Sequence, residues 1–423
     1  MNATLLNQEI KTDVVVIGGG PAGMAAALSA SKNGAHVLLI ERDVRLGGIL
    51  NQCIHNGFGL HYFKEELTGP EYAQRFAERV LADENIDVLT DAIVLSLDDK
   101  RKTLSVLSAG GLRTVSAGAI VLAMGCRERT AGAISLLGTR PAGIYTAGAA
   151  QKFINHYGKL PGKTAVILGS GDIGLIMARR LTFEGATVKL VAELMPYSSG
   201  LKRNIVQCLD DFDIPLEFST TVTRVVGKER VEGVFVARVD ANNTPIPETE
   251  RFIECDTLLL SVGLIPENDL ISDSGITMNA ITGGAEADEW RQTSTPGVFS
   301  CGNVLHVHDL ADNVSLEGEI AGASAARVAR GEALPPCTVR VNGTGGVRYA
   351  MPSTLSEGEG KVTVFFRVGK VFKNAKLIVT SGKTVIAKKA ALIFTPGEME
   401  SVSIDKSKLC GDVTLRIEEG EQR

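Results

Sequence analysis

The chain has 423 residues, with 44 Lys and Arg against 49 Asp and Glu, which gives a net charge of −5. This length is enough for two or three domains of ordinary size. The acidic balance argues against a nucleic-acid-binding protein, which needs a basic face. The N-terminal segment lacks the basic-then-apolar pattern of a secretory signal, and no apolar run is long enough to span a membrane. We therefore expect a cytoplasmic protein with no membrane span.

The seven cysteines are scattered along the chain, and no two of them form a C-x-x-C pair. This spacing argues against a disulfide framework and against a thiolate zinc site. The compositional excess is glycine, with 46 residues. Because glycine allows tight turns and a close approach of the backbone to a ligand, its positions are more informative than its number.

The first predicted elements form a strand, a turn and a helix. A β-branched strand, Val14–Ile17, leads directly into a Gly-rich turn, and an Ala-rich helical stretch follows. In a dinucleotide-binding unit of this kind, Gly18 permits the tight turn and Gly20 lets the backbone approach a pyrophosphate. Gly23 lets the helix pack closely on the strand, and the N-terminus of the helix supplies N–H donors to the phosphate.

The strand after this helix ends in an acid. His36–Ile40 is predicted as a strand, and Glu41 follows it at the place where a carboxylate can accept hydrogen bonds from a ribose. A glycine pattern alone is weak evidence of a nucleotide site, but here the strand, the helix and the acid accompany it. Further strands are predicted at residues 86–89, 92–97, 103–107 and 119–123.

The same order of elements returns in the middle of the chain. Strand Thr164–Leu168 precedes a second Gly-rich turn with Gly169, Gly171 and Gly174, and a second helical stretch follows. The next strand ends at Glu193. A carboxylate there suits the free 2′-hydroxyl of NAD(H) and repels the 2′-phosphate of NADP(H), and no arginine stands in the next three positions. We therefore predict that this unit prefers NAD(H).

The composition changes at residues 334–336, after a last helical segment predicted at 318–330. The remaining chain consists of short strand-like runs between Gly and Pro turns, which indicates a small β-sandwich. The predicted fold class is therefore α/β, with two Rossmann-like units and a C-terminal β-rich domain. Other predicted strands lie at residues 216–218, 233–239, 257–262, 338–343, 361–368, 376–381, 383–394, 400–405 and 413–419.

Four further segments accompany the two Gly-rich turns and give the chain a family resemblance: Glu41-Arg42 with Gly47-Gly48, Ala119–Gly125, Leu258–Asp269 and Thr295–Asn303. Over roughly residues 13–330 it resembles the pyridine-nucleotide–disulfide reductase superfamily, whose members bind FAD in one such domain and a nicotinamide nucleotide in the other. The resemblance implies a discontinuous FAD-binding domain at 1–142 and 264–334, an inserted NAD-binding domain at 143–263, and a separate β-rich domain at 335–423.

The resemblance implies a site for each cofactor. Glu41 would bind the adenosine ribose of FAD, and the backbone near Ile93 would meet the adenine. Asn303 stands where the family has an Asp against the ribityl chain, so the contact keeps an acceptor and loses a charge. The helix opening near Val314–Gly318 would direct its N-terminus at the O2 side of the flavin. The implied FAD residues are Gly18, Gly20, Pro21, Ala22, Gly23, Glu41, Arg42, Gly47, Gly48, Ile93, Ala123, Gly125, Gly302, Asn303, Val314 and Ser315. The implied NAD residues are Gly169, Gly171, Asp172, Ile173, Gly174, Glu193 and Gly263.

The main departure from the family is at the redox disulfide. Disulfide reductases of the family have a cysteine pair just after Gly47-Gly48, but here only Cys53 occurs, at neither of the paired positions. We therefore expect no internal dithiol. Cys53 could be a single redox thiol, as in the NADH oxidase, NADH peroxidase and coenzyme A disulfide reductase branch, with His55 beside it. An inert, packed cysteine is the favoured alternative, because buried free cysteines are common.

A His-x-His pair at His306 and His308 could bind a metal. No other residue nearby completes a ligand set with convincing spacing, so we predict no metal. Two other interpretations stay open. The pair could belong to an ordinary connector between a strand and a helix, or one histidine could lie near the flavin.

A closer resemblance concerns the runs 47–76 and 302–322. They are similar to flavoproteins that accompany bacterial anaerobic glycerol-3-phosphate dehydrogenases, and related subunits occur in dehydrogenases of amino acids and opines. This implies an FAD-dependent NADH oxidoreductase that serves a partner redox subunit or dehydrogenase within an oligomer. One alternative is a self-contained enzyme that uses Cys53. The other is a flavin-bound docking or scaffold subunit, with the β-rich domain as its interaction surface.

Overall fold

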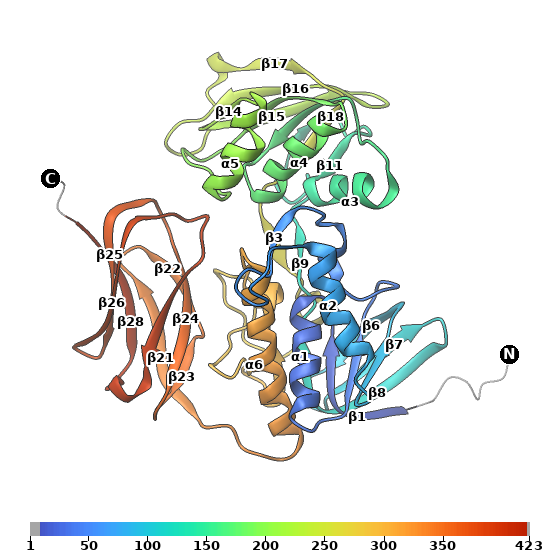
Figure 1. The fold of residues 1–423 in the computed structure, drawn as a ribbon. Helices are drawn as coiled ribbons and strands as arrows, with labels where there is room; N and C mark the ends of the chain where they lie inside the picture. Colours follow the sequence, from blue (N-terminus) through green and yellow to red (C-terminus); the bar gives the residue numbers. More distant parts are fainter. Residues whose placement is uncertain (1–8, 421–423) are drawn as a thin grey trace. The chain divides into compact units, whose positions relative to one another are not determined.

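The computed structural model describes residues 9–420 of the chain (Figure 1). The chain divides into two compact units, of which the second is Arg127–Ile265 and the first is the remainder. The connections between them run through β9 (Cys126–Glu128) and β19 (Leu264–Pro266), which pair in a two-stranded sheet. Residues 127–142, placed in the first domain by the sequence analysis, pack with the second unit. Within the described residues, no helix combines the length and apolar character needed to cross a bilayer.

The first unit is built on a largely parallel sheet in the order β5-β2-β1-β8-β7-β6, and β20 also pairs with β8. Its central strands are apolar on both faces, as expected of a parallel sheet covered on each side. Strand β7 runs antiparallel to both of its neighbours, β6 and β8. The strands are β1 (Glu9–Ile17), β2 (Val37–Ile40), β5 (Ile86–Leu89), β6 (Ala92–Asp98), β7 (Thr103–Ser108), β8 (Gly111–Leu122) and β20 (Val298–Ser300).

Two helices of small residues lie side by side on this sheet, α1 (Pro21–Lys32) and α6 (Ala311–Ala329) (Figure 1). A Cβ atom added to Gly318 of α6 would overlap the carbonyl oxygen of Ala22 in α1. The two helix backbones are therefore in direct contact, which explains why the facing positions are alanine and glycine. This contact fixes where the first turn of each helix lies.

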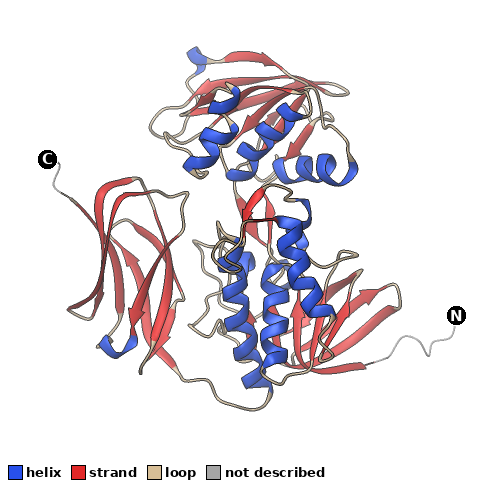
Figure 2. Cartoon of the chain, viewed as in Figure 1, coloured by secondary structure: helices blue, strands red, loops and turns tan. Residues whose placement is uncertain are grey.

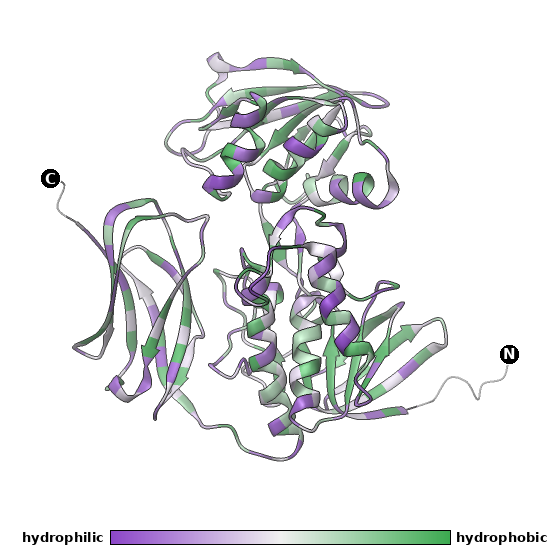
Figure 3. Cartoon of the chain, in the orientation of Figure 1, coloured by the Kyte–Doolittle hydropathy of each residue, from purple (hydrophilic) through white to green (hydrophobic). Residues whose placement is uncertain are grey.

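A third helix, α2 (Gly69–Leu81), buries one face and exposes the other. It begins at a capping box in which Thr68 and Glu71 satisfy each other's backbone N–H groups. Its buried face carries Tyr72 and Phe76, and its colouring in Figure 3 alternates between hydrophilic purple and apolar green. A short hairpin of β3 (Asn56–Phe58) and β4 (Leu67–Thr68) precedes it.

Helix α6 begins well before the segment predicted from the sequence. The sequence analysis placed this helix at 318–330 and its opening near Val314–Gly318, but the structure begins it at Ala311. The early turns are polar and therefore look like a loop in the sequence. Asp312 in the first turn is buried and accepts a hydrogen bond from the Tyr62 backbone at 3.2 Å, so a tertiary contact extends the helix.

The second unit has a five-stranded parallel sheet in the order β11-β18-β12-β13-β14 and a four-stranded sheet in the order β10-β15-β16-β17. The helices are α3 (Ala147–Tyr157), α4 (Asp172–Phe183) and α5 (Lys202–Cys208). The strands are β10 (Leu137–Gly138), β11 (Ile144–Thr146), β12 (Thr164–Leu168), β13 (Thr187–Ala192), β14 (Leu216–Glu217), β15 (Thr220–Gly227), β16 (Val231–Arg238), β17 (Arg251–Glu254) and β18 (Thr257–Leu260).

The C-terminal region of the first unit is almost entirely strand (Figure 2). One sheet has the order β23-β21-β28-β25-β26 and the other the order β22-β24-β27. The β-rich character predicted for this region, and the α/β class of the whole, are confirmed. Its strands are β21 (Cys337–Thr344), β22 (Val347–Met351), β23 (Thr354–Ser356), β24 (Lys361–Val368), β25 (Phe372–Ser381), β26 (Thr384–Phe394), β27 (Glu400–Asp405) and β28 (Val413–Glu419).

Candidate functional site

The first Gly-rich turn joins β1 to α1. Gly18 has a φ of +105°, and a Cβ atom there would overlap the carbonyl oxygen of Ala123. A Cβ atom on Gly23 would overlap the carbonyl oxygen of Gly18. At Gly20, by contrast, an added Cβ atom would have no atom of residues 9–420 within 4 Å. Gly20 also caps α1 without a side chain and Pro21 has no N–H group, so the remaining amides of the first turn stay available to a ligand.

The acid after β2 is tied to this turn. One carboxylate oxygen of Glu41 accepts a hydrogen bond from the Gly19 backbone at 2.6 Å, and the other accepts one from the Asp43 backbone at 2.7 Å. Each oxygen retains a second lone pair for a ligand hydroxyl. The Ala92 amide donates to the Glu41 carbonyl at 3.1 Å, which brings the start of β6 beside the acid. Two further residues predicted for this site are exposed, Arg42 and Ile93.

A second loop packs against the same turn. The Gly47 amide donates to the Gly19 carbonyl at 2.8 Å, and a Cβ atom on Gly48 would lie 3.2 Å from the Cα of Gly20. Gly125, after β8, has a φ of +75° and open space where its Cβ atom would lie. These glycines therefore surround one stretch of accessible backbone at the carboxyl ends of the strands.

Asn303 is oriented by two hydrogen bonds. Its side-chain oxygen accepts from the His308 backbone at 3.0 Å, and its amide nitrogen donates to the Cys126 sulfur at 3.5 Å. Its neighbour Gly302 has a φ of +73° and donates its N–H to Glu317 at 2.8 Å. The position of Asn303 thus depends on the segment that follows it.

The first turns of α6 are packed rather than open. Val314 is buried, and its side chain lies 3.1 Å from where a Cβ atom on Gly302 would be. The Ser315 hydroxyl is buried and accepts a hydrogen bond from Tyr72 at 2.8 Å. Both predicted FAD residues therefore hold the helix in place. The helix has no side-chain cap at Leu310.

The two predicted catalytic residues lie in the loop before β3. The Cys53 thiol is buried and donates to the Ile49 carbonyl at 3.3 Å, and burial raises the pKa of this thiol to about 12. It is therefore protonated near neutral pH, which favours the packed thiol over a nucleophile. The His55 ring nitrogen lies 3.0 Å from the Asn56 carbonyl oxygen, and the ring packs on Phe58. All seven cysteines lie in the described residues, and none is in a disulfide.

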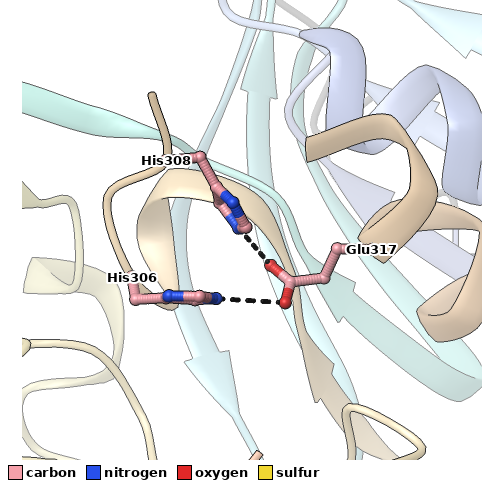
Figure 4. Close-up of side chains that lie close together, drawn as sticks. All are labelled: His306, His308 and Glu317. Carbon is pink, nitrogen blue, oxygen red and sulfur yellow. Dashed lines mark hydrogen bonds and ion pairs between the residues drawn. The ribbon is translucent and has the colours of Figure 1, made fainter. Parts of the chain in front are cut away.

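A buried network that the sequence did not reveal joins Glu317 to His306 and His308 (Figure 4). One oxygen of Glu317 lies 3.2 Å from Nε2 of His306 and 2.8 Å from Nε of Arg291. The other lies 3.0 Å from Nε2 of His308 and 2.8 Å from the Gly302 amide. All four side chains are buried. Glu317 reaches this place from the second turn of α6, which no spacing rule could have found.

The network is a poor metal site, although Glu317 supplies the third ligand that the sequence analysis did not find. Its carboxylate already accepts four hydrogen bonds, and the guanidinium of Arg291 would repel a cation. Among the residues that the structure describes, Nδ1 of each histidine has no hydrogen-bond partner, whereas metal-bound histidines usually donate from their second nitrogen. The absence of a metal stays a prediction.

Burial sets the charge state of this network. It lowers the pKa of His306 to about 4, so this ring is neutral near pH 7. Burial alone would raise the pKa of Glu317, but attraction to His306 and Arg291 holds it well below its usual value. The charge of Arg291 is permanent, so its attraction to Glu317 persists when His306 is neutral. The network therefore contains one buried ion pair, between Arg291 and Glu317, beside the neutral ring of His306.

Ser261 packs against all three glycines of the second Gly-rich turn, which joins β12 to α4. A Cβ atom on Gly169 would overlap the Ser261 carbonyl oxygen. Added Cβ atoms on Gly171 and Gly174 would lie 2.8 Å and 2.6 Å from the Ser261 side chain. The Ser261 hydroxyl also accepts a hydrogen bond from the Gly174 amide at 3.1 Å. The turn has the same glycines as the first one but less open space.

The acid after β13 repeats the arrangement of the first acid. Glu193 accepts hydrogen bonds from the Ser170 amide at 2.8 Å, from the Ser170 hydroxyl at 2.5 Å and from the Met195 amide at 2.9 Å. The Ser199 amide donates to the Ser170 hydroxyl at 3.1 Å. The loop after the acid therefore folds back onto the turn.

The loop that follows Glu193 also brings two cations near the second turn, which the sequence analysis did not consider. Asp172, at the start of α4, accepts hydrogen bonds from the Leu201 amide at 2.8 Å and from Asn204 at 2.6 Å. These bonds hold the start of α5 near the second turn, and its first residues are the exposed Lys202 and Arg203. Two further residues were predicted to bind NAD. Ile173 is half-buried and packs on the core of the second unit, and Gly263 has a φ of +101°.

Residues 12–333 match the model of the pyridine nucleotide-disulphide oxidoreductase family. The chain belongs to this family. Its fold and the order of its motifs agree with this membership, and the family typically binds FAD and a nicotinamide nucleotide. The chain is therefore a flavoprotein oxidoreductase of the Rossmann type.

Several curated relatives are components of larger enzymes. The chain is 29% identical to a component of the opine oxidase of Agrobacterium tumefaciens, over 62% of this chain and 54% of that protein. It is 27% identical to the HcnB component of the hydrogen cyanide synthase of Pseudomonas protegens, over 73% of this chain and 69% of that protein. It thus spans about half of the first relative. A thioredoxin reductase of T. acidophilum shares the fold, with a TM-score of 0.61 at 23% identity, over 75% of this chain and 98% of that one.

Proposed function

We propose that this chain is an FAD-dependent NADH oxidoreductase that passes electrons between NAD(H) and a partner redox subunit. The observation that carries the proposal is the open backbone at Gly20, beside an acid, Glu41, that keeps free lone pairs. A pyrophosphate needs such an approach to a helix N-terminus. When bound, FAD and NAD(H) supply the hydride chemistry, which depends more on positioning than on an acid or base.

In this proposal the residues of the first unit hold FAD. The turn from Gly18 to Gly23 receives the pyrophosphate, and Glu41 binds the ribose. Asn303 directs its amide group to the ribityl chain. Its oxygen already accepts from His308, so a donated N–H bond is the contact that it best offers. The start of α6 places positive dipole near the flavin.

The residues of the second unit hold NAD(H). Glu193 keeps a carboxylate at the ribose position, which supports a preference for NAD(H) over NADP(H). The exposed Lys202 and Arg203 favour the opposite choice, since two cations at this place would attract a 2′-phosphate. We propose NAD(H) because Glu193 is bonded directly to the turn through Ser170, whereas Lys202 and Arg203 lie on the following loop and helix.

The proposed partner is a dehydrogenase that oxidises the organic substrate. Relatives whose names describe them as subunits of opine oxidase and hydrogen cyanide synthase support an electron-transfer role. The absence of any cysteine pair near Gly47-Gly48 supports an acceptor other than an internal dithiol. A glycerol-3-phosphate dehydrogenase-like partner follows from the resemblance of residues 47–76 and 302–322. An oligomeric assembly follows from the habit of the family and from the additional β-rich domain.

The proposal is tested by anaerobic titration of the purified flavoprotein with NADH and then with NADPH, following the visible absorption of the flavin. Stoichiometric bleaching by NADH without a long-wavelength thiolate-to-flavin band is the expected result. Failure of both nucleotides to bleach the flavin would contradict the proposal. Rapid bleaching would also exclude a scaffold protein that has lost its redox activity.

The alternative that uses Cys53 is tested separately. A Cys53→Ser variant keeps the size of the side chain and removes the thiol. Because the thiol is buried and protonated, we expect turnover with NADH and an artificial acceptor to stay within about two-fold of the unmodified protein. Loss of turnover, together with a thiolate-to-flavin band in the unmodified protein, would favour a single-cysteine enzyme.

A further inference from the structure

The segment between Asn303 and α6 lacks regular structure of its own. A short 3-10 helix ends at Val304, and α6 begins at Ala311. Between them, no helix or sheet ladder sets the path of the chain, so side chains must hold it. Both ends of the segment belong to the proposed flavin site. Whatever holds the segment therefore also sets that site.

Residues of the C-terminal β region hold this segment in place. Arg367, on β24, forms an ion pair with Asp309 and donates to the Val307 carbonyl at 3.1 Å. Its other terminal nitrogen donates to the Gly397 carbonyl at 2.7 Å, within the β region. The side chains of Arg367 and Asp309 are only 15% and 16% exposed. One guanidinium thus joins the segment to two parts of the β region.

Asp309 makes a second bond to the β region. Its other carboxylate oxygen accepts a hydrogen bond from the Met399 backbone at 2.5 Å. Both oxygens of this carboxylate are therefore engaged by residues that follow α6 in the chain. Removing either member of such a largely buried pair leaves the other charge without its partner, which is strongly unfavourable.

Aromatic rings of the β region also pack against the histidines of the ion-pair network. The ring of Phe365 lies 5.9 Å from that of His306 and 5.5 Å from that of His308, between centroids. The ring of Tyr349 lies 6.0 Å from that of His306. The β region thus packs directly on the buried histidines.

The segment passes this restraint on to the predicted flavin contacts. The His308 amide, one residue before Asp309, donates to the side chain of Asn303 at 3.0 Å. On the other side, α6 begins two residues after Asp309, and its Asp312 is bonded to the backbone of Tyr62. A shift at residue 309 would therefore move Asn303 and the first turn of α6 together.

We infer that the C-terminal β region is a structural part of the flavin site, and that Arg367 is the positioning residue through which it acts. This inference rests on the proposed function, because it takes FAD to lie against Asn303 and the start of α6. It gives the β region a role in the flavin site through a defined set of contacts.

The test compares Arg367→Met with the unmodified full-length protein. After removal of the flavin, each protein is titrated with FAD, and the visible circular dichroism and midpoint potential of the bound flavin are recorded. We expect the Kd for FAD to rise about ten-fold in Arg367→Met, with a changed dichroism spectrum and potential. Arg367→Lys should fall between the two, because an ammonium can pair with Asp309 without also reaching the carbonyl groups.

The control is Lys370→Met, which removes an exposed ion pair with Glu419 on the same β region. It should leave FAD affinity and dichroism unchanged. Should Arg367→Met fold poorly, Asp309→Asn removes the same pair while keeping the shape of the side chain. A folded variant of either kind that binds FAD like the unmodified protein, with the same spectrum and potential, would overturn the inference. An unmodified protein that binds no FAD would instead contradict the proposed function.

Discussion

The two Gly-rich turns use an acid in the same way. Glu41 accepts a hydrogen bond from the Gly19 amide at 2.6 Å, and Glu193 accepts one from the Ser170 amide at 2.8 Å. Each acid also accepts from the backbone two residues further on. A shared sequence pattern therefore produces a shared local geometry, because strand, turn and acid lie within one continuous unit.

The turns differ in what surrounds the middle glycine. In the described part of the chain, an added Cβ atom on Gly20 would have no neighbour within 4 Å, whereas one on Gly171 would lie 2.8 Å from the Ser261 hydroxyl. The first turn thus leaves more room for a cofactor held tightly against the backbone. The glycine motif is the same, and the neighbouring loop makes the difference.

The largest predicted contrast concerns the third glycine of each turn. In Gly23→Ala the new methyl group would overlap the rigid Gly18 carbonyl oxygen, so we expect the free energy of unfolding to fall by about 4 kcal/mol or more. In Gly174→Ala the methyl group meets the Ser261 side chain, and the loss should be about 1–3 kcal/mol. Denaturant unfolding of both variants measures the difference. Equal losses of unfolding free energy in the two variants would contradict the comparison. Adding Ser261→Gly should restore stability to Gly174→Ala and not to Gly23→Ala.

A second contrast concerns the dependence of stability on acidic pH. Burial lowers the pKa of His306 from 6.5 to about 4, so on acidification the unfolded chain takes up the proton first. The contribution of the neutral His306 ring to the free energy of unfolding is therefore fully present above pH 6.5. This contribution, about 3 kcal/mol in total, is lost as the pH falls towards 4. The single tryptophan, Trp290, directly precedes Arg291 of the network and reports its unfolding by fluorescence. His306→Gln should flatten this acid dependence, whereas the exposed His156→Gln of the second unit should leave it unchanged.

A smaller contrast isolates the open space at Gly20. We expect Gly20→Ala to leave the unfolding free energy of the flavin-free protein within about 0.5 kcal/mol of the original. Its methyl group would occupy the space of the pyrophosphate, so the Kd for FAD should rise by about ten-fold or more. Fluorescence titration of the flavin-free protein measures this. The matched variant Gly171→Ala should weaken NADH binding and leave FAD binding unchanged; a rise in FAD Kd in that variant would break the comparison.

The smallest effect concerns the choice of nucleotide. Replacing Glu193 with Gln removes the charge that repels a 2′-phosphate but keeps a side chain of the same size. We expect the preference for NADH over NADPH to narrow by about ten-fold. Lys202→Ala should widen it again, since that cation favours the phosphate. Kinetics of flavin reduction by each nucleotide give both values, and an unchanged preference would remove Glu193 from this role.

Local patterns predicted much of the fold. The runs at 361–368 and 400–405 were predicted as strands and are β24 and β27, because alternating β-branched and polar residues are typical of a half-buried strand. Strands β15 and β17 were not predicted, although β15 is as long as its partner β16. The β15 segment is rich in Thr and Val, so its local strand signal was present and was missed, whereas the four-residue β17 forms a strand by pairing with β16. The predicted start of α6 was also wrong, because the contacts of Asp312 with the distant residues 61 and 62 do not show in the local sequence.

By itself, the sequence determined the two glycine turns, their acids, the missing cysteine pair and the order of the elements. These features depend on residues that are close along the chain, where backbone geometry limits the possible structures. Only the tertiary structure decided that Glu317 joins His306 and His308 next to Gly302, and that Arg367 holds the segment between Asn303 and α6. Those contacts join residues from separate elements, and a buried charge finds its partner through packing, which no spacing along the chain records.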